Sequence, residues 1–297
     1  MMRIVTRGDF DGLTSTVLLS EVMQIGGEIR MVHPKDAQDG KVKAEADEIV
    51  INLPYIPGCG LWFDHHVSEE VKLPEKYKGR FEVAPSSARV IYNHYAAEHG
   101  AKFERYKEML EATDKLDSAQ LSTDDVTNPS GWILLGLTLD PRSGLGPEFR
   151  KYFRWLAEYV KEVPLGKVLK HAEVLKRTER VLEEQEDFEL LLAEHAKKDG
   201  NVVITDLRGL KDKPVGNRFL VFTMFPAANV ELRIFDGHKG AVVVAVGHSI
   251  FNRTCKVNVG KLLEGYGGGG HHGAGSAQFD PAVAEAKIKE ILKTLKE

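Results

Sequence analysis

Two aspartates near the N-terminus are spaced to bind a divalent cation. Asp9 and Asp11 lie in a D-x-D-G segment between an apolar run and a helix-forming one. At such a junction both carboxylates lie at the carboxyl end of a strand, and hard divalent cations prefer oxygen ligands of this kind. The alternative is a solvated turn in which an aspartate caps the helix. We interpret the pair as one part of a metal site.

An acid followed by two histidines ends a second apolar run. Asp64, His65 and His66 follow a short strand-like segment that begins at Gly60. Imidazole is a ligand for manganese, iron and zinc, and a parallel sheet brings the carboxyl ends of its strands to one edge. A satisfied polar network in the core would use the same residue types. We expect the two histidines to lie beside the aspartates of the D-x-D-G segment.

A glycine-rich segment near the C-terminus has the composition of a phosphate site. Four glycines, Gly267 to Gly270, precede His271 and His272. Glycines leave backbone N–H groups unshielded and allow close approach of a phosphate, and imidazoles can donate to its oxygens. The alternative is a flexible linker, although linkers usually carry serines and acids in place of a histidine pair. Arg253 follows another apolar run, and its guanidinium can bind a phosphate through two hydrogen bonds.

The elements that carry these residues alternate between strands and helices in the first third of the chain. Apolar, β-branched runs predict strands, and the periodic runs between them predict helices. This alternation predicts an α/β fold with a doubly wound, mainly parallel sheet, whose ligands bind at the carboxyl ends of the strands. The expected strands are 3–6, 28–33, 48–53 and 60–64, and the expected helices are 12–25 and 86–99.

A long charged segment separates this region from a second set of strands. From Pro164 to about Lys198 there is no internal proline, and Val168, Leu175 and Leu182 recur at an interval of seven residues. This pattern predicts one long connecting helix. A second, smaller α/β domain then follows, with strands expected at 201–207, 229–235 and 241–247 and a closing helix at 281–296.

Length and composition limit the number of domains and the choice of partner. With 297 residues, of which 42% are hydrophobic, the chain can form two packed cores. We predict domains at 1–160 and 200–297, joined by a connecting segment at 161–199. A net charge of −4 argues against a long nucleic acid, because proteins that hold one are usually basic. A small phosphorylated substrate fits better, and the sequence does not set the oligomeric state.

The hydrophobic pattern and the cysteines indicate a cytoplasmic protein. No apolar run approaches the roughly 18 residues of a membrane span, and the N-terminal charges have the wrong order for a signal peptide. The two cysteines, Cys59 and Cys255, lie far apart and form no CxxC pair. We therefore expect no disulfide framework and no contact with a membrane.

The order of these motifs resembles that of the DHH/DHHA1 phosphoesterases over nearly the whole chain. It runs from D-x-D-G through D-H-H, an acidic helix and a long connecting helix to a GGGH-x-x-A-G-like loop. The resemblance implies an N-terminal DHH domain, a C-terminal substrate-binding DHHA1 domain and a divalent metal, with manganese favoured. It also implies hydrolysis of a phosphoester or phosphoanhydride bond in a short oligonucleotide, a bisphosphonucleotide, a cyclic dinucleotide or polyphosphate.

The same resemblance implies roles for individual residues. It makes Asp11 and His65 metal ligands and gives His66 a place on the substrate side. Asp114 best matches the last ligand, with Asp117 as the alternative because spacing alone leaves the register open. The implied substrate-binding residues of the C-terminal domain are Arg253, Gly269, Gly270, His271 and His272.

Two residues depart from the pattern of the family. Arg7 stands where the family has its first metal ligand, a histidine or an aspartate, and Asn52 stands where it has a bridging aspartate. Arginine has no lone pair for a cation, and asparagine offers only a neutral carbonyl. One interpretation is that Arg7 replaces one cation, so that Arg7, Asp9 and His66 assist catalysis at a single ion. The other is a catalytically impaired nucleotide-binding protein. The retained histidine and two aspartates favour the enzyme, because these are the ligand types of an open catalytic site.

Overall fold

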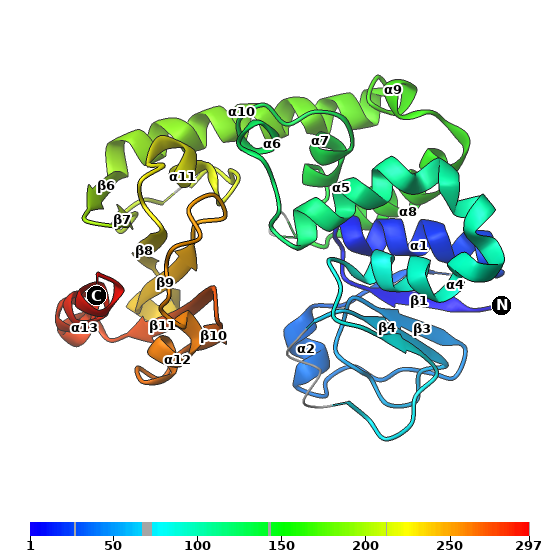
Figure 1. The fold of residues 1–297 in the computed structure, drawn as a ribbon, viewed down its shortest axis with the longest axis horizontal. Helices are drawn as coiled ribbons and strands as arrows, with labels where there is room; N and C mark the ends of the chain where they lie inside the picture. Colours follow the sequence, from blue (N-terminus) through cyan, green and yellow to red (C-terminus); the bar gives the residue numbers. More distant parts are fainter. Residues whose placement is uncertain (27, 67–72, 142–143, 212, 297) are drawn as a thin grey trace. The chain divides into compact units, whose positions relative to one another are not determined.

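The computed structural model describes the chain as two compact units (Figure 1). The described residues are 1–26, 28–66, 73–141, 144–211 and 213–296. One unit comprises Met1–Gln120 and Pro129–Glu179, and the other comprises Leu121–Asn128 and Arg180–Glu297. Within these ranges, none of the helices combines the length and the apolar character that a bilayer crossing requires.

The first unit is built on a five-stranded parallel sheet with the order β2-β1-β3-β4-β5. All four residues of β3 are buried, as expected for a parallel strand that is covered on both faces. The predicted α/β class with a doubly wound parallel sheet is therefore confirmed. The strands are β1 (Arg3–Thr6), β2 (Arg30–Met31), β3 (Glu48–Ile51), β4 (Leu61–Asp64) and β5 (Gly79–Phe81).

Helix α1 is the central helix of this unit. It is buried continuously from Phe10 to Leu19, because α4, α5 and α8 all pack against it. A helix that is apolar on every side is typical of such a buried position. The other face of the sheet packs a second apolar cluster, which includes Val50 and Trp62. The helices are α1 (Phe10–Val22), α2 (Pro34–Gln38), α4 (Ser87–Phe103), α5 (Lys107–Asp117), α7 (Gly131–Leu137), α8 (Pro147–Glu162) and α9 (Leu165–Val168).

The segment that was expected to form one connecting helix contains a break. Helix α9 ends at Val168, and α10 (Ala172–His195) begins four residues later. His171 lies at this break, where its Nδ1 accepts a hydrogen bond from the backbone N–H of Glu173 at 3.3 Å. An acceptor at this position satisfies one of the free N–H groups at the start of a helix.

The second unit contains a six-stranded mixed sheet with the order β10-β11-β9-β8-β7-β6. Neighbouring strands are antiparallel except for β7 and β8, which are parallel. Its core joins alternate residues of β8, such as Leu232, to Ile288 and Ile291 of α13. The elements are β6 (Ala196–Asp199), β7 (Val202–Asp206), β8 (Val230–Asp236), β9 (Val242–His248), β10 (Gly269–His271), β11 (Ala274–Phe279), α6 (Thr123–Thr127), α11 (Leu220–Met224), α12 (Val259–Glu264) and α13 (Pro281–Leu295).

Candidate active site

Asp11 is held by the first turn of α4. Its Oδ2 accepts a hydrogen bond from the backbone N–H of Ser87 at 2.9 Å, and its Oδ1 accepts one from Ala88 at 2.8 Å. The free N–H groups at a helix start favour a negative charge. The carboxylate is nevertheless fully buried, and burial, followed by the nearby charge of Asp117, raises its pKa to about 7. Asp11 is thus fixed in place, but the positive charge around it is too small to offset the effect of burial on its pKa.

His65 directs one ring nitrogen at the carboxylates of the site. Its Nδ1 lies 3.0 Å from the carbonyl oxygen of Ala84. Because a carbonyl can only accept, Nδ1 carries a proton and donates to it, which leaves Nε2 to face the carboxylates. Nε2 lies 2.9 Å from Oδ2 of Asp117 and 3.9 Å from Oδ2 of Asp11. A histidine oriented by a backbone carbonyl is the usual arrangement of a metal-binding imidazole.

Asp117 completes a cluster of three possible ligands. It is the last residue of α5, and hydroxyls of Thr14 and Thr113, 2.7 Å apart, join α1 to α5 in the interior. One ligand atom from each of Asp11, His65 and Asp117 lies within 4.8 Å of the others. Although burial raises the pKa of Asp117, the neighbouring His65 lowers it overall. Two carboxylates and an imidazole nitrogen are a donor set that suits a divalent cation.

Asp114 lies one turn earlier on the same helix and is not part of this cluster. Its Oδ1 accepts a hydrogen bond from the hydroxyl of Ser86 at 2.6 Å, and its Oδ2 accepts one from Nε of Arg89 at 2.9 Å. Ser86 also caps α4, since its hydroxyl accepts from the backbone N–H of Arg89 at 3.0 Å. The residue that spacing favoured as the last ligand therefore supports α4, whereas the alternative, Asp117, lies beside His65.

Asp9 binds both residues that depart from the family pattern. Its Oδ2 accepts a hydrogen bond from Nε of Arg7 at 2.9 Å, and its Oδ1 accepts from Nδ2 of Asn52 at 3.0 Å and from the backbone of Gly12 at 2.9 Å. Burial raises the pKa of Asp9, and the charge of Arg7 offsets only part of that rise. In the sequence, Arg7 and Asn52 are two separate departures from the family pattern. In the structure, both side chains bind the carboxylate of Asp9.

His66 lies next to His65 and is paired with the acid of the same motif. Its Nδ1 is 2.8 Å from Oδ1 of Asp64, whose side chain is fully buried. Burial lowers the pKa of His66, but the hydrogen bond and charge of Asp64 raise it overall. With Nδ1 held by the carboxylate, Nε2 is the nitrogen that can exchange a proton with a ligand.

The predicted phosphate-binding residues belong to the second unit. Gly269, Gly270 and His271 form the exposed edge strand β10 rather than a loop. A Cβ on Gly270 would lie 2.2 Å from the carbonyl oxygen of Ala274, so no larger residue fits without a shift. Arg253 is also exposed, and its Nε donates to the carbonyl of Ile250 at 3.0 Å.

A third histidine, which the sequence reasoning missed, lies at this hairpin. The rings of His248 and His272 meet edge to face, with centroids 5.5 Å apart. Nε2 of His248 donates to the carbonyl of Val257 at 3.0 Å, and burial lowers the pKa of His248. The sequence feature that could have identified His248 is its position at the end of an apolar strand, four residues before Asn252–Arg253.

Comparison with known proteins finds relatives among the solved structures. No protein-family model matches the sequence, and no curated protein matches it. PggH, a pGpG-specific phosphodiesterase from Vibrio cholerae, is 35% identical to this chain over 99% of both chains, with a TM-score of 0.85.

Two more distant structures share the fold. The DHH domain of a member of the s1p family of ribosomal proteins has a TM-score of 0.64 at 13% identity, covering 100% of this chain and 87% of that one. RecJ from Thermus thermophilus, in complex with Mn²⁺, has a TM-score of 0.54 at 14% identity, covering 99% of this chain and 52% of RecJ.

The crowding of acids around His65 predicts that the chelator-treated protein loses stability as the pH rises. Burial alone lowers the pKa of His65, but Asp117 and Asp11 raise it from 6.5 to about 10. A raised folded-state pKa contributes stability below pH 6.5 that is lost as the pH rises toward 10. In EDTA, the melting temperature should fall by at least about 5 °C over this window. His65→Ala should show a much smaller fall, and an equal fall in both proteins would contradict the assignment.

Proposed function

The chain belongs to the DHH/DHHA1 phosphoesterase family, and on that premise we propose that it is a metal-dependent phosphodiesterase for a short linear dinucleotide such as pGpG. The proposed substrate rests on the 35% identity to a pGpG-specific phosphodiesterase over 99% of both chains. The observation that supports the chemistry is the cluster of Asp11, His65 and Asp117. The net charge of −4 favours a short substrate over a long nucleic acid. PggH is a phosphodiesterase, which favours the interpretation of this chain as an enzyme over that of an impaired binding protein.

Asp11, His65 and Asp117 are the residues that we propose as metal ligands. The buried Nε2 of His65 lies 2.9 Å from an oxygen of Asp117 and 3.9 Å from one of Asp11, so these three groups can bind one cation together once Nε2 has lost its proton. A divalent ion bound there would polarise the phosphoryl group and lower the pKa of a water molecule. Mn²⁺ suits this mixed set of oxygen and nitrogen donors. Asp114 is replaced in this role by Asp117, because Arg89 already neutralises it.

Arg7 and His66 are the residues that we propose to act on the substrate. Nε of Arg7 binds Asp9, and its terminal nitrogens can donate to the phosphoryl oxygens as negative charge develops on them. His66 is held by Asp64 with a raised pKa, so its Nε2–H can give a proton to the leaving oxygen. Asp9 orients the guanidinium, and Asn52 holds Asp9 in turn.

The second unit supplies the remaining proposed substrate-binding groups. These are the guanidinium of Arg253, the exposed backbone of Gly269 and Gly270, and the imidazoles of His271 and His272. Glycine backbone and imidazole donors are suited to phosphate oxygens. The proposed role of Arg253 is to bind the phosphate equally in the ground state and in the transition state, so that it contributes to affinity and not to turnover.

Metal analysis combined with hydrolysis of pGpG tests the central proposal. The purified protein should hold about one Mn²⁺ per chain and should cleave pGpG at least about tenfold faster, as kcat/KM, than cyclic dinucleotides, bisphosphonucleotides or polyphosphate. His65→Ala and Asp117→Asn should lose both metal and turnover, because each removes a ligand. Asp114→Asn should retain the metal. His99→Ala is the matched control, since this imidazole lies on α4 outside the cluster. Unchanged metal content in His65→Ala would refute the site.

Restoring the family residues at positions 7 and 52 tests whether Arg7 stands in for a cation. Arg7→His with Asn52→Asp should raise the metal content from about one ion to about two, because an imidazole and a carboxylate replace a non-ligand and a neutral amide. Arg7→His alone should be less active than the wild type, since it removes positive charge before a carboxylate is present to recruit an ion. The effects should therefore be non-additive. Two ions in the wild-type protein would overturn the proposal, as would an unaffected Arg7→His variant.

Arg253→Ala tests the role of the second unit. A group that binds the phosphate equally in the ground state and the transition state raises KM when it is lost and leaves kcat nearly unchanged. We expect KM for pGpG to rise about tenfold, because a charge-assisted hydrogen bond of roughly 1.5–3 kcal/mol is removed. Lys256→Ala is a nearby control that removes a charge of the same sign. An unaltered KM would show that Arg253 is not a substrate contact.

A further inference from the structure

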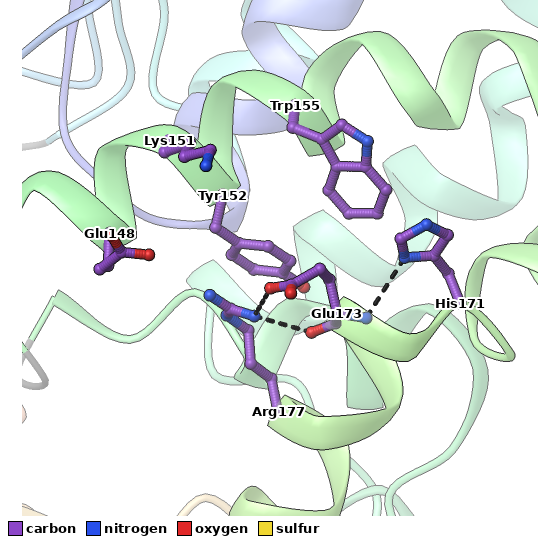
Figure 2. Close-up of a pocket in the computed structure, with 7 residues that line it drawn as sticks. All are labelled: Glu148, Lys151, Tyr152, Trp155, His171, Glu173 and Arg177. Atoms are coloured by element: carbon purple, nitrogen blue, oxygen red, sulfur yellow. Dashed lines mark hydrogen bonds and ion pairs between the residues drawn. The ribbon is translucent and has the colours of Figure 1, made fainter.

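A cavity of about 220 Å³ lies between α8 and the start of α10, within the first unit (Figure 2). None of the residues that line it belongs to the proposed catalytic cluster. It is lined by aromatic rings, two cations and two carboxylates, which is the mixture that nucleotide-binding sites use. Its size is below the roughly 300–1,000 Å³ of sites for drug-sized ligands. The space therefore suits one nucleobase with its sugar rather than a dinucleotide.

Trp155 and His171 form an aromatic wall of this cavity. Their ring centroids are 4.5 Å apart, and the indole is also stacked on Tyr159 at 4.6 Å. His171 is fixed by the hydrogen bond that its Nδ1 accepts from the backbone of Glu173. Side chains held in this way present a rigid surface. These side chains therefore lose little further conformational entropy when a flat base binds against them.

Arg177 is fixed at the base of the cavity. Its guanidinium carbon lies 4.0 Å from the centroid of the Tyr152 ring, and its Nη1 donates to the carboxylate of Glu173 at 2.7 Å and to the carbonyl of the same residue at 2.8 Å. The hydroxyl of Tyr152 is 2.8 Å from that of Thr138. Glu173 is thereby neutralised, and the planar cation of Arg177 is held in one orientation.

Lys151 and Glu148 are the two charged side chains that remain for a ligand. They lie on adjacent turns of α8, on the same side of the cavity (Figure 2). Both are exposed, and neither forms an ion pair with another residue of the described ranges. An ammonium group suits a phosphate. A carboxylate only accepts hydrogen bonds, and guanine offers it two adjacent donors, N1–H and N2–H, where adenine offers a donor beside an acceptor.

We propose that this cavity is a second nucleotide site, which binds one guanine nucleotide with a single phosphate. The base lies against Trp155 and His171, the carboxylate of Glu148 binds its N1–H and N2–H groups, and Lys151 binds the phosphate. The preference for guanine rests in part on the proposed function, because hydrolysis of pGpG releases this class of molecule. The stacking and the phosphate contact rest on the geometry of the cavity alone.

Titration of guanosine monophosphate into the full-length His65→Ala variant with EDTA tests the site while the catalytic cluster is disabled. Binding is followed by calorimetry and by quenching of tryptophan fluorescence. In this background, Trp155→Ala should weaken binding about tenfold or more, as expected for loss of one stacking partner. Lys151→Gln should weaken it as well, whereas Arg150→Gln, the same change on the neighbouring residue, should not. Glu148→Gln should abolish the preference for guanosine over adenosine monophosphate.

The outcomes separate this site from the proposed reaction. Equal affinity in the parent and Trp155→Ala proteins would overturn the site, as would equal effects of Lys151→Gln and Arg150→Gln. Equal affinity for the two monophosphates in the parent protein would overturn the assignment to guanine. If the wild-type protein does not hydrolyse pGpG but binding still depends on Trp155, the proposed function fails and the site stands. If the wild-type protein hydrolyses pGpG and Trp155→Ala binds guanosine monophosphate normally, the proposed function stands and the second site fails.

Discussion

The segment from Ala84 to Ala88 is the constraint on which the cluster of Asp11, His65 and Asp117 depends. Its first carbonyl accepts a hydrogen bond from Nδ1 of His65, and its last two N–H groups hold Asp11. Five consecutive residues therefore orient two ligands from different strand ends. A carboxylate as buried as that of Asp11 is costly without such partners, so the start of α4 and the position of Asp11 have to be specified together. Ser86, which caps α4 and binds Asp114, links this segment to α5.

The charges around Asp9 and Asp11 differ in a way that agrees with one ion rather than two. Asp9 has a guanidinium at 2.9 Å and an amide at 3.0 Å, so its oxygens already have donors. Asp11 has backbone donors and a histidine but no full positive charge from Arg or Lys among the causes of its raised pKa. These surroundings support the proposal of one cation beside Asp11, since the charge of Arg7 would repel a second one beside Asp9. The asparagine at position 52 fits the same scheme, because it can donate to Asp9 where an aspartate could not.

Sequence patterns predicted the fold class and strands β1 to β4 of the first unit, but not the edge strand β5. Each predicted strand of the first unit ends where its polar residues begin, and parallel pairing brings those ends together. The choice between Asp114 and Asp117 could not be made in this way. Residues three apart on a helix lie on nearly the same face, so both positions satisfy the spacing. Only the partners decide, and Arg89, which neutralises Asp114, belongs to another helix. The cavity on α8 was also out of reach, because Trp155 and Arg177 come from separate helices and form no short motif.

The glycine segment shows why composition alone gave an incomplete account of the second unit. Unshielded backbone was expected to serve a phosphate, but the glycines also allow close packing of the chain on itself. A Cβ on Gly275 would lie 2.5 Å from the carbonyl oxygen of Gly269, and one on Gly260 of α12 would lie 2.7 Å from that of Gly270. Hairpin and helix could not approach so closely with larger residues. Because β10 is an exposed edge strand, its outer backbone groups can still bind a ligand. Because the glycines have this packing role, a substitution that impairs binding at this hairpin has to be checked for folding before it is assigned to the substrate.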